Sequence, residues 1–172
     1  MLAWAKSTGF LPERLEGVLP REFIWWPNNL ELVRHALQIL ELKPDDVLLD
    51  IGSGDLRACI IALEEYDVNL CVAVEVNWKV LKEALKFLKT INYDKLNRIL
   101  IICADFWRIG KRIAKIANKA LFLAWRINPR MEAKLIKTLT HTKTIVHNFG
   151  NPENLKIIKP QQQKSLPFLG PL

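Results

Sequence analysis

Three carboxylates lie at or near the ends of apolar stretches, and two glycines follow the first of them. These residues are Asp50, Glu75 and Asp105, with Gly52 and Gly54. Ligands of nucleotide-binding α/β folds lie at the carboxyl ends of parallel strands, where glycines permit a sharp turn and close backbone approach. Glu75 follows Gly54 by roughly 20 residues, the separation at which an acid on the second strand meets ribose hydroxyls. The three acids suit a ligand with an amino group, a ribose diol and an exocyclic amine.

The elements that would position these acids alternate along the chain. Strands are predicted over residues 47–51, 70–76, 99–104, 121–125 and 144–149. Helices are predicted over residues 56–63, 109–118 and 129–139, and another helix, capped by Asn28 or Asn29, precedes the first strand. The apolar strands indicate a sheet that is covered on both faces. The alternation predicts an α/β fold with a Rossmann-like, doubly wound, mostly parallel sheet.

Length and composition favour one cytoplasmic domain over residues 1–172, with residues 1–22 as an N-terminal arm and residues 160–172 as a mobile tail. The longest apolar runs are too short to span a bilayer, so no membrane partner is expected. The cysteines are odd in number, lie far apart and lack metal-ligand spacing, as is typical of buried reduced thiols without a metal. These residues are Cys59, Cys71 and Cys103.

The formal charge of +7 permits binding to nucleic acid or to acidic proteins and does not choose between them. Lysines recur at helical spacing over residues 79–89, and a second basic stretch covers residues 111–119. Two solvated helix faces explain both stretches, and a nucleic-acid groove is the alternative.

Between Trp26 and Phe149 the sequence resembles the class I S-adenosylmethionine-dependent methyltransferases, in particular the small archaeal protein lysine methyltransferases. The resemblance rests on six short blocks, which are Pro27-Asn28-x-x-Glu31-Leu32-Val33, Asp50-x-Gly52-x-Gly54-Asp55-x-Arg57, Val74-Glu75-x-Asn77, Asp105-Phe106, Lys134-Leu135-x-Lys137-x-Leu139 and His147-Asn148-Phe149. It implies the class I methyltransferase fold, S-adenosyl-L-methionine as cofactor and a protein lysine as acceptor. This family normally ends its sheet with an antiparallel hairpin. Residues 155–159 supply one strand, and prolines in the tail predict a reduced or atypical hairpin.

The resemblance also implies cofactor-binding roles. Asp50 would hold the amino group of the cofactor or its water network, and Glu75 would accept both ribose hydroxyls. Gly52 and Gly54 would allow close backbone approach. Asp105 would accept from the adenine amine, with Phe106 against the ring or simply in the core.

Three positions depart from the family pattern. Leu56 replaces the usual third glycine, and we expect its side chain to narrow the pocket and weaken cofactor binding. Phe122 stands where the lysine methyltransferases have tyrosine, and Asn148 stands where the fifth strand usually offers an acid. No catalytic residue is assigned, and the candidates at the strand ends are Phe122, Trp125 and His147, with Arg126 as a further substrate contact.

Three functions therefore stay open: a protein lysine methyltransferase, an RNA methyltransferase, and a methyltransferase-like module with impaired catalysis. The coherent set of acids favours the first two, and Leu56 and Phe122 favour the third. No Asn-Pro-Pro-Tyr type motif is present, which argues against methylation of base amino groups in its usual form. A nicotinamide-dependent dehydrogenase is disfavoured because no separate substrate domain or catalytic pair is evident.

Overall fold

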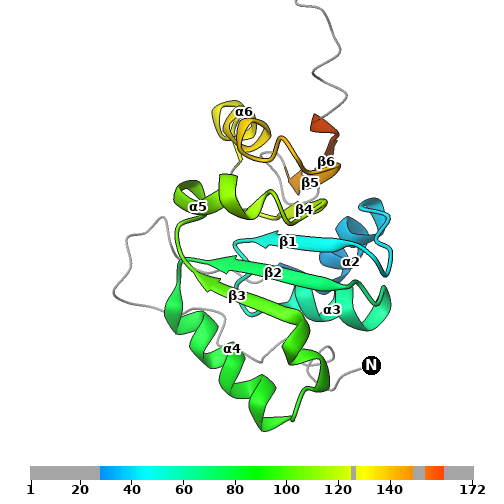
Figure 1. Cartoon of the computed structure of the whole chain (residues 1–172), viewed down its shortest axis with the longest axis vertical. Helices are drawn as coiled ribbons and strands as arrows, with labels where there is room; N and C mark the ends of the chain where they lie inside the picture. Colours follow the sequence, from blue (N-terminus) through cyan, green and yellow to red (C-terminus); the bar gives the residue numbers. More distant parts are fainter. Residues whose placement is uncertain (1–27, 125–126, 149–153, 161–172) are drawn as a thin grey trace, which may run out of the picture.

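The structure is a computed structural model that describes residues 28–124, 127–148 and 154–160. Its centre is a six-stranded sheet with the order β3-β2-β1-β4-β5-β6 (Figure 1). The strands are β1 (Val47–Ile51), β2 (Leu70–Glu75), β3 (Ile99–Cys103), β4 (Lys119–Phe122), β5 (Thr144–Asn148) and β6 (Leu155–Ile158). All neighbouring strands are parallel except β5 and β6, which are antiparallel. The predicted Rossmann-like sheet is therefore confirmed.

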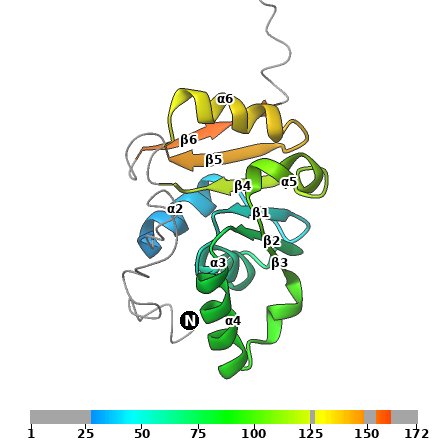
Figure 2. The same cartoon turned by 90° about the vertical axis from the view of Figure 1, so that its left-hand side faces the viewer.

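Helices cover both faces of this sheet. They are α2 (Leu30–Ile39), α3 (Arg57–Glu65), α4 (Trp78–Thr90), α5 (Phe106–Ile113) and α6 (Pro129–Thr138), with a short 3-10 helix, η2 (Asp94–Arg98). A first core cluster joins the sheet to α2, α3 and α4, and a second joins the opposite face to α5 and α6. Figure 2 shows α2 and α5 on opposite sides of β4. Among the described residues, no helix has the length and apolarity needed to cross a bilayer.

Strand register brings the predicted acids to one edge of the sheet. Asp50 pairs with Ala73, so Glu75 lies one residue beyond the end of the β1–β2 ladder. Glu75 in turn pairs with Cys103, the last residue of β3, and Asp105 follows two residues later. Since all three strands run in the same direction, their carboxyl ends meet at the same edge, where ligands bind in this class of sheet.

Asparagine and aspartate side chains set the starts of several helices. Asn29, Asn77 and Asn128 each accept a hydrogen bond from a backbone N–H in the first turn, as N-caps do. Asp105 does the same for α5, which therefore begins at Phe106 and not at residue 109 as predicted. The prediction was wrong because the capping signal of Asp105 was read only as a ligand contact.

The bounds of β4 also differ from the prediction. β4 covers Lys119–Phe122 instead of residues 121–125, and Trp125 lies outside the described residues. β6 pairs directly with β5 and supplies the single strand expected at 155–159. The antiparallel pair at the end of the sheet is thus confirmed. The arm at 1–22 and almost all of the tail at 160–172 lie outside the described residues, so the reduced hairpin stays a prediction.

Gly110 allows α5 to pack closely beside α6. A Cβ at this position would lie 2.7 Å from the Phe106 ring and 2.7 Å from Thr138 Cγ2. Replacing glycine in a helix normally stabilises it by roughly 1 kcal/mol, but overpacking costs about 1–3 kcal/mol. We therefore expect Gly110→Ala to lower the free energy of unfolding by up to about 2 kcal/mol, measured by urea denaturation. An increase in stability would show that α5 moves away from α6 without cost.

Candidate functional site

The glycine turn after β1 crosses the carboxyl end of β2. Gly52 and Gly54 have φ values of +73° and +52°, in the left-handed region that favours glycine. The N–H groups of Gly52 and Ser53 both donate to the carbonyl of Val74, at 2.8 and 3.1 Å. A Cβ at Gly52 would meet nothing within 4 Å, so this side of the turn is open. The turn thus offers a ligand close approach to its backbone.

Glu75 is held in place by two backbone donors. Its Oε2 accepts from Gly54 N at 3.0 Å, and its Oε1 accepts from Asn77 N at 2.8 Å. The residue is buried, yet each carboxylate oxygen retains a second lone pair. Glu75 therefore links the glycine turn to the start of α4 and has remaining capacity to accept from two hydroxyls.

Asp50 lies deeper, on the face covered by α3, and is 4% exposed. Its Oδ2 lies 3.5 Å from Cys59 Sγ, the thiol donor. Burial raises the pKa of Asp50 from 3.8 to about 7; the Cys59 hydrogen bond opposes this shift, and the charges of Glu75 and Asp55 add to it. A cation arriving beside Asp50 would favour the ionised form, so the site suits a ligand with a positive group.

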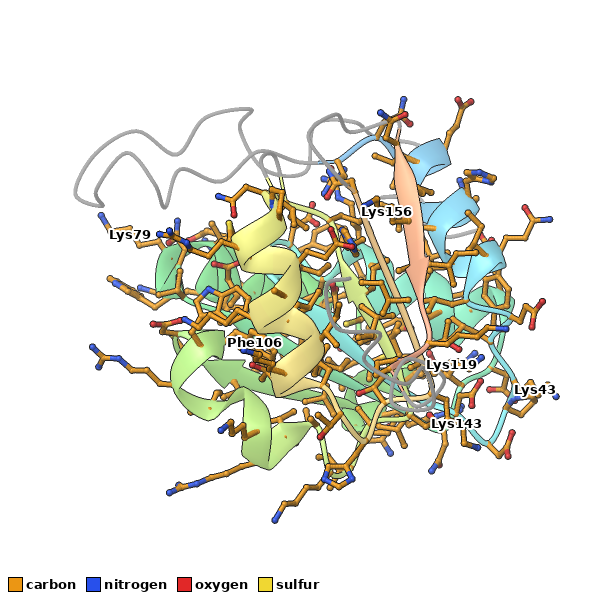
Figure 3. The ribbon with its side chains drawn as sticks, turned by 90° about the horizontal axis from the view of Figure 1, so that it is seen from above. Lys43, Lys79, Phe106, Lys119, Lys143 and Lys156 are labelled. Carbon is orange, nitrogen blue, oxygen red and sulfur yellow. The ribbon has the colours of Figure 1, made fainter. Side chains whose placement is uncertain are left out.

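Asp105 lies at the same edge, at the start of α5. Its Oδ1 accepts from Trp107 N at 2.9 Å, and its side chain is 42% exposed. Phe106 belongs to the second core cluster and packs edge-on against Trp107, with ring centroids 5.2 Å apart. Figure 3 shows Phe106 where α5 and α6 meet. The predicted role of Phe106 beside an adenine stays a prediction, and its observed contacts are those of a core residue.

Leu56 precedes α3 with φ +68° and is 0% exposed. Its side chain belongs to the first core cluster, between sheet and helices. The expectation that Leu56 narrows the pocket is therefore revised, because its side chain is enclosed among core residues. Sequence reasoning identified the position next to the turn but not the direction in which the side chain leaves the backbone.

The catalytic candidates lie on the opposite face of the sheet or outside the described residues. Phe122 is buried and packs edge-on against Trp107, with ring centroids 6.1 Å apart. His147 is fully buried, and its Nε2 lies 3.8 Å from Glu132 Oε1 on α6. Trp125 and Arg126 fall in the undescribed gap. The structure thus brings neither Phe122 nor His147 next to Asp50.

Asn148 connects the ends of two strands. Its Oδ1 accepts a 2.8 Å hydrogen bond from Ala124 N, which follows β4. The amide thus supports the carboxyl edge at the position where the family pattern has an acid. Sequence reasoning treated Asn148 only as a lost carboxylate and missed this structural contact.

A second group of contacts, around Arg57, was also missed. Arg57 Nε lies 2.8 and 3.1 Å from the two carboxylate oxygens of Asp55, and its Nη1 lies 2.5 Å from the carbonyl oxygen of Asn28. The Asp-x-Arg spacing after the glycines was visible in the sequence. Its connection to Asn28, 29 residues away, depends on the fold.

Comparison with known proteins agrees with this geometry. The chain is 30% identical over 127 residues to a protein-lysine N-methyltransferase of Saccharolobus islandicus (strain REY15A), spanning 72% of this chain and 74% of that protein. The chain belongs to the class I S-adenosylmethionine-dependent methyltransferases. S-adenosylmethionine is the cofactor of these methyltransferases, which confirms the cofactor prediction. No protein-family profile matches the sequence.

Solved structures of methyltransferases share the fold. One is an RNA methyltransferase from Salinibacter ruber in complex with S-adenosyl-L-homocysteine, with a TM-score of 0.60, 22% identity, and coverage of 72% of this chain and 78% of that chain. Another is a precorrin-6y C5,15-methyltransferase from Geobacter metallireducens, with a TM-score of 0.56, 21% identity, and coverage of 77% and 68%. These similarities concern the fold of a methyltransferase and leave the acceptor open.

Proposed function

We propose that this methyltransferase transfers the methyl group of S-adenosylmethionine to a protein lysine. The observation that carries the proposal is the pairing of the glycine turn with Glu75, whose carboxylate accepts from Gly54 N at 3.0 Å. This arrangement places an acceptor of hydroxyl hydrogen bonds beside an open turn. The named activity of the 30% identical relative supports lysine as the acceptor.

The residues of the site fit the cofactor. Glu75 would accept from the ribose hydroxyls, and Asp50 would accept from the cationic amino group. Gly52 and Gly54 would leave room for the backbone to approach. Asp105 Oδ2, which lies 3.9 Å from Arg108 Nε, would accept from the adenine amine. When bound, the cofactor supplies a methyl group on a sulfonium for an in-line displacement, in which alignment of the reacting atoms about 3 Å apart accounts for much of the rate.

We place the acceptor at the carboxyl end of β4. Asn148 holds Ala124 N there, so the chain that leads to Trp125 starts from a fixed point. Phe122 and His147 would support this edge from the other face through their contacts with Trp107 and Glu132.

RNA is the second candidate acceptor, favoured by the exposed face of α4. Trp78 is 54% exposed at the first position of the helix, and Lys82 Nζ lies 5.8 Å from its ring centroid. Lys86 and Lys89 are exposed on the same face. An aromatic ring among lysines is a feature of surfaces that stack bases and contact phosphates.

A labelled-methyl transfer assay separates these functions. Wild-type protein and Glu75→Ala would be incubated with S-adenosylmethionine and either a protein extract or an RNA pool. The proposal expects label on lysine in protein, identified by mass spectrometry, and little label with Glu75→Ala. Label in RNA alone would support the second candidate, and cofactor binding without transfer to either pool would identify a module with impaired catalysis.

A further inference from the structure

Arg57 forms a two-pronged contact with an almost fully buried carboxylate directly after the glycine turn. Its Nη2 lies 2.5 Å from Asp55 Oδ2, and its Nε lies 2.8 Å from Asp55 Oδ1. The side chain of Asp55 is 1% exposed and that of Arg57 is 15% exposed. Such fork-to-carboxylate pairs fix the direction of the guanidinium as well as its charge. Arg57 is therefore a rigid group at the N-terminus of α3.

The remaining arm of the guanidinium reaches the chain before α2. Arg57 Nη1 donates to the carbonyl of Asn28 at 2.5 Å. The side chain of Asn28 continues the connection, because its Nδ2 donates to the carbonyl of Leu123 at 3.2 Å. We call Asp55, Arg57 and Asn28 the clamp. It joins the glycine turn, the start of α2 and the carboxyl end of β4.

The glycine turn does not depend on the clamp for its own position. Glu75 binds Gly54 N, and the carbonyl of Val74 binds the N–H groups of Gly52 and Ser53. The chain beyond β4 is held from two sides: Asn28 Nδ2 donates to the carbonyl of Leu123, and Ala124 N donates to Asn148 Oδ1 on β5. Through Asn28, the clamp links this chain to the glycine turn, whereas Asn148 links it only to the neighbouring strand.

We propose that Arg57 is a positioning residue that sets the carboxyl end of β4 relative to the cofactor turn. This inference rests on the proposed function, because the end of β4 is where we place the methyl acceptor. Small displacements of reacting groups lower the rate strongly, and about 1 Å can cost on the order of 100-fold. Loss of the clamp should therefore reduce turnover more than it reduces cofactor affinity.

Arg57→Lys tests the clamp with charge retained. A lysine has one ammonium group and no planar fork, so it cannot bind Asp55 with two parallel hydrogen bonds and reach Asn28 at once. Arg98→Lys is the matched control. Arg98 Nη1 contacts Asp67 Oδ1 at 2.7 Å and its Nε contacts the carbonyl of Asn69 at 3.2 Å, at the opposite edge of the sheet.

The measurements are kcat for methyl transfer at saturating S-adenosylmethionine and the Kd of S-adenosylmethionine by calorimetry. For Arg57→Lys we expect kcat to fall more than about fivefold while Kd rises less than about fivefold, with neither change in Arg98→Lys. Asn28→Ala, which removes the contact to Leu123 but keeps its own carbonyl, should lower kcat in the same way. A smaller fall in kcat, an equal fall in Arg98→Lys, or a Kd that rises as much as kcat falls would overturn the positioning role.

Amide hydrogen exchange supplies a readout besides activity. In Arg57→Lys, the exchange rate relative to wild type should rise more in residues 28–30 and 123–124 than in the glycine turn. Arg98→Lys should leave the rates in these residues unchanged. If Arg57→Lys changes the exchange rate equally in the three segments, or in none of them, the clamp is refuted even in an active enzyme. A wild-type protein that transfers no methyl group to protein would instead refute the proposed function, and the exchange result would still decide whether the clamp exists.

Discussion

Asp50→Asn is expected to raise the free energy of unfolding at pH 8 by about 2–4 kcal/mol. The reason is that burial raises the pKa of Asp50 to about 7 from 3.8, so the folded protein binds a proton that the unfolded chain has released. The stabilising contribution of that proton is fully present below pH 3.8 and is lost as the pH rises through about 7. Above that pH, the folded wild type carries a buried, ionised carboxylate, which lowers its stability. Asparagine has no charge at this position, so the variant avoids this cost.

Urea denaturation at pH 5 and pH 8 checks this expectation. The stability difference between Asp50→Asn and wild type should grow by about 2–3 kcal/mol from pH 5 to pH 8. Asp45→Asn, at an exposed position, controls for the change in net charge. A difference that stays the same at both pH values would contradict the raised pKa.

The same substitution should weaken binding of S-adenosylmethionine, because asparagine offers the cationic amino group no opposite charge. In the wild type, binding should shift Asp50 toward its ionised form, so the protein releases protons below pH 7 and its affinity falls as the pH decreases through that range. Calorimetry in buffers with different protonation enthalpies measures this release. Asp50→Asn should show weaker binding, by about 2 kcal/mol, and less proton release. Equal proton release in both proteins would assign it to another group.

Leu56→Gly is expected to lower the free energy of unfolding by about 2–4 kcal/mol. Removing a fully buried leucine from a core costs about 2–5 kcal/mol, and the added backbone freedom of glycine costs roughly 1 kcal/mol. Glycine adopts the left-handed conformation at φ +68° without the steric cost that leucine bears there, which offsets about 1–2 kcal/mol of this loss. The loss of packing is the larger effect, so stability falls.

Leu56→Ala is the matched variant, because it removes most of the side chain but keeps the strained conformation. It should be no more stable than Leu56→Gly. Denaturation and cofactor titration of both variants separate packing from obstruction. If Leu56→Gly keeps its stability and binds S-adenosylmethionine more tightly, the side chain obstructs the pocket after all.

The local pattern around Asp50 and Glu75 was sufficient to predict the sheet and the edge at which the acids meet. An apolar strand, a glycine turn and an acid on the next strand are short-range signals, and parallel register then brings their ends together. The start of α5 was missed although Asp105 carried a capping signal that could have been read.

Other features depend on contacts between distant segments. The side chain of Leu56 enters the core because of a positive φ angle that a leucine residue seldom adopts. His147 lies beneath α6, and alternation along β5 does not reveal which face that helix covers. The link from Arg57 to Asn28 joins residues that only the folded sheet brings together.

The central claim is that the glycine turn and Glu75 form the binding site for S-adenosylmethionine. The most direct test is calorimetric titration of wild type and Glu75→Ala with S-adenosylmethionine, with circular dichroism to show that both proteins are folded. We predict binding of one cofactor per wild-type chain and a loss of about 1–3 kcal/mol in Glu75→Ala, which is roughly a 5- to 150-fold weaker affinity. No binding by the wild type, or the same affinity in a folded Glu75→Ala, would contradict the account.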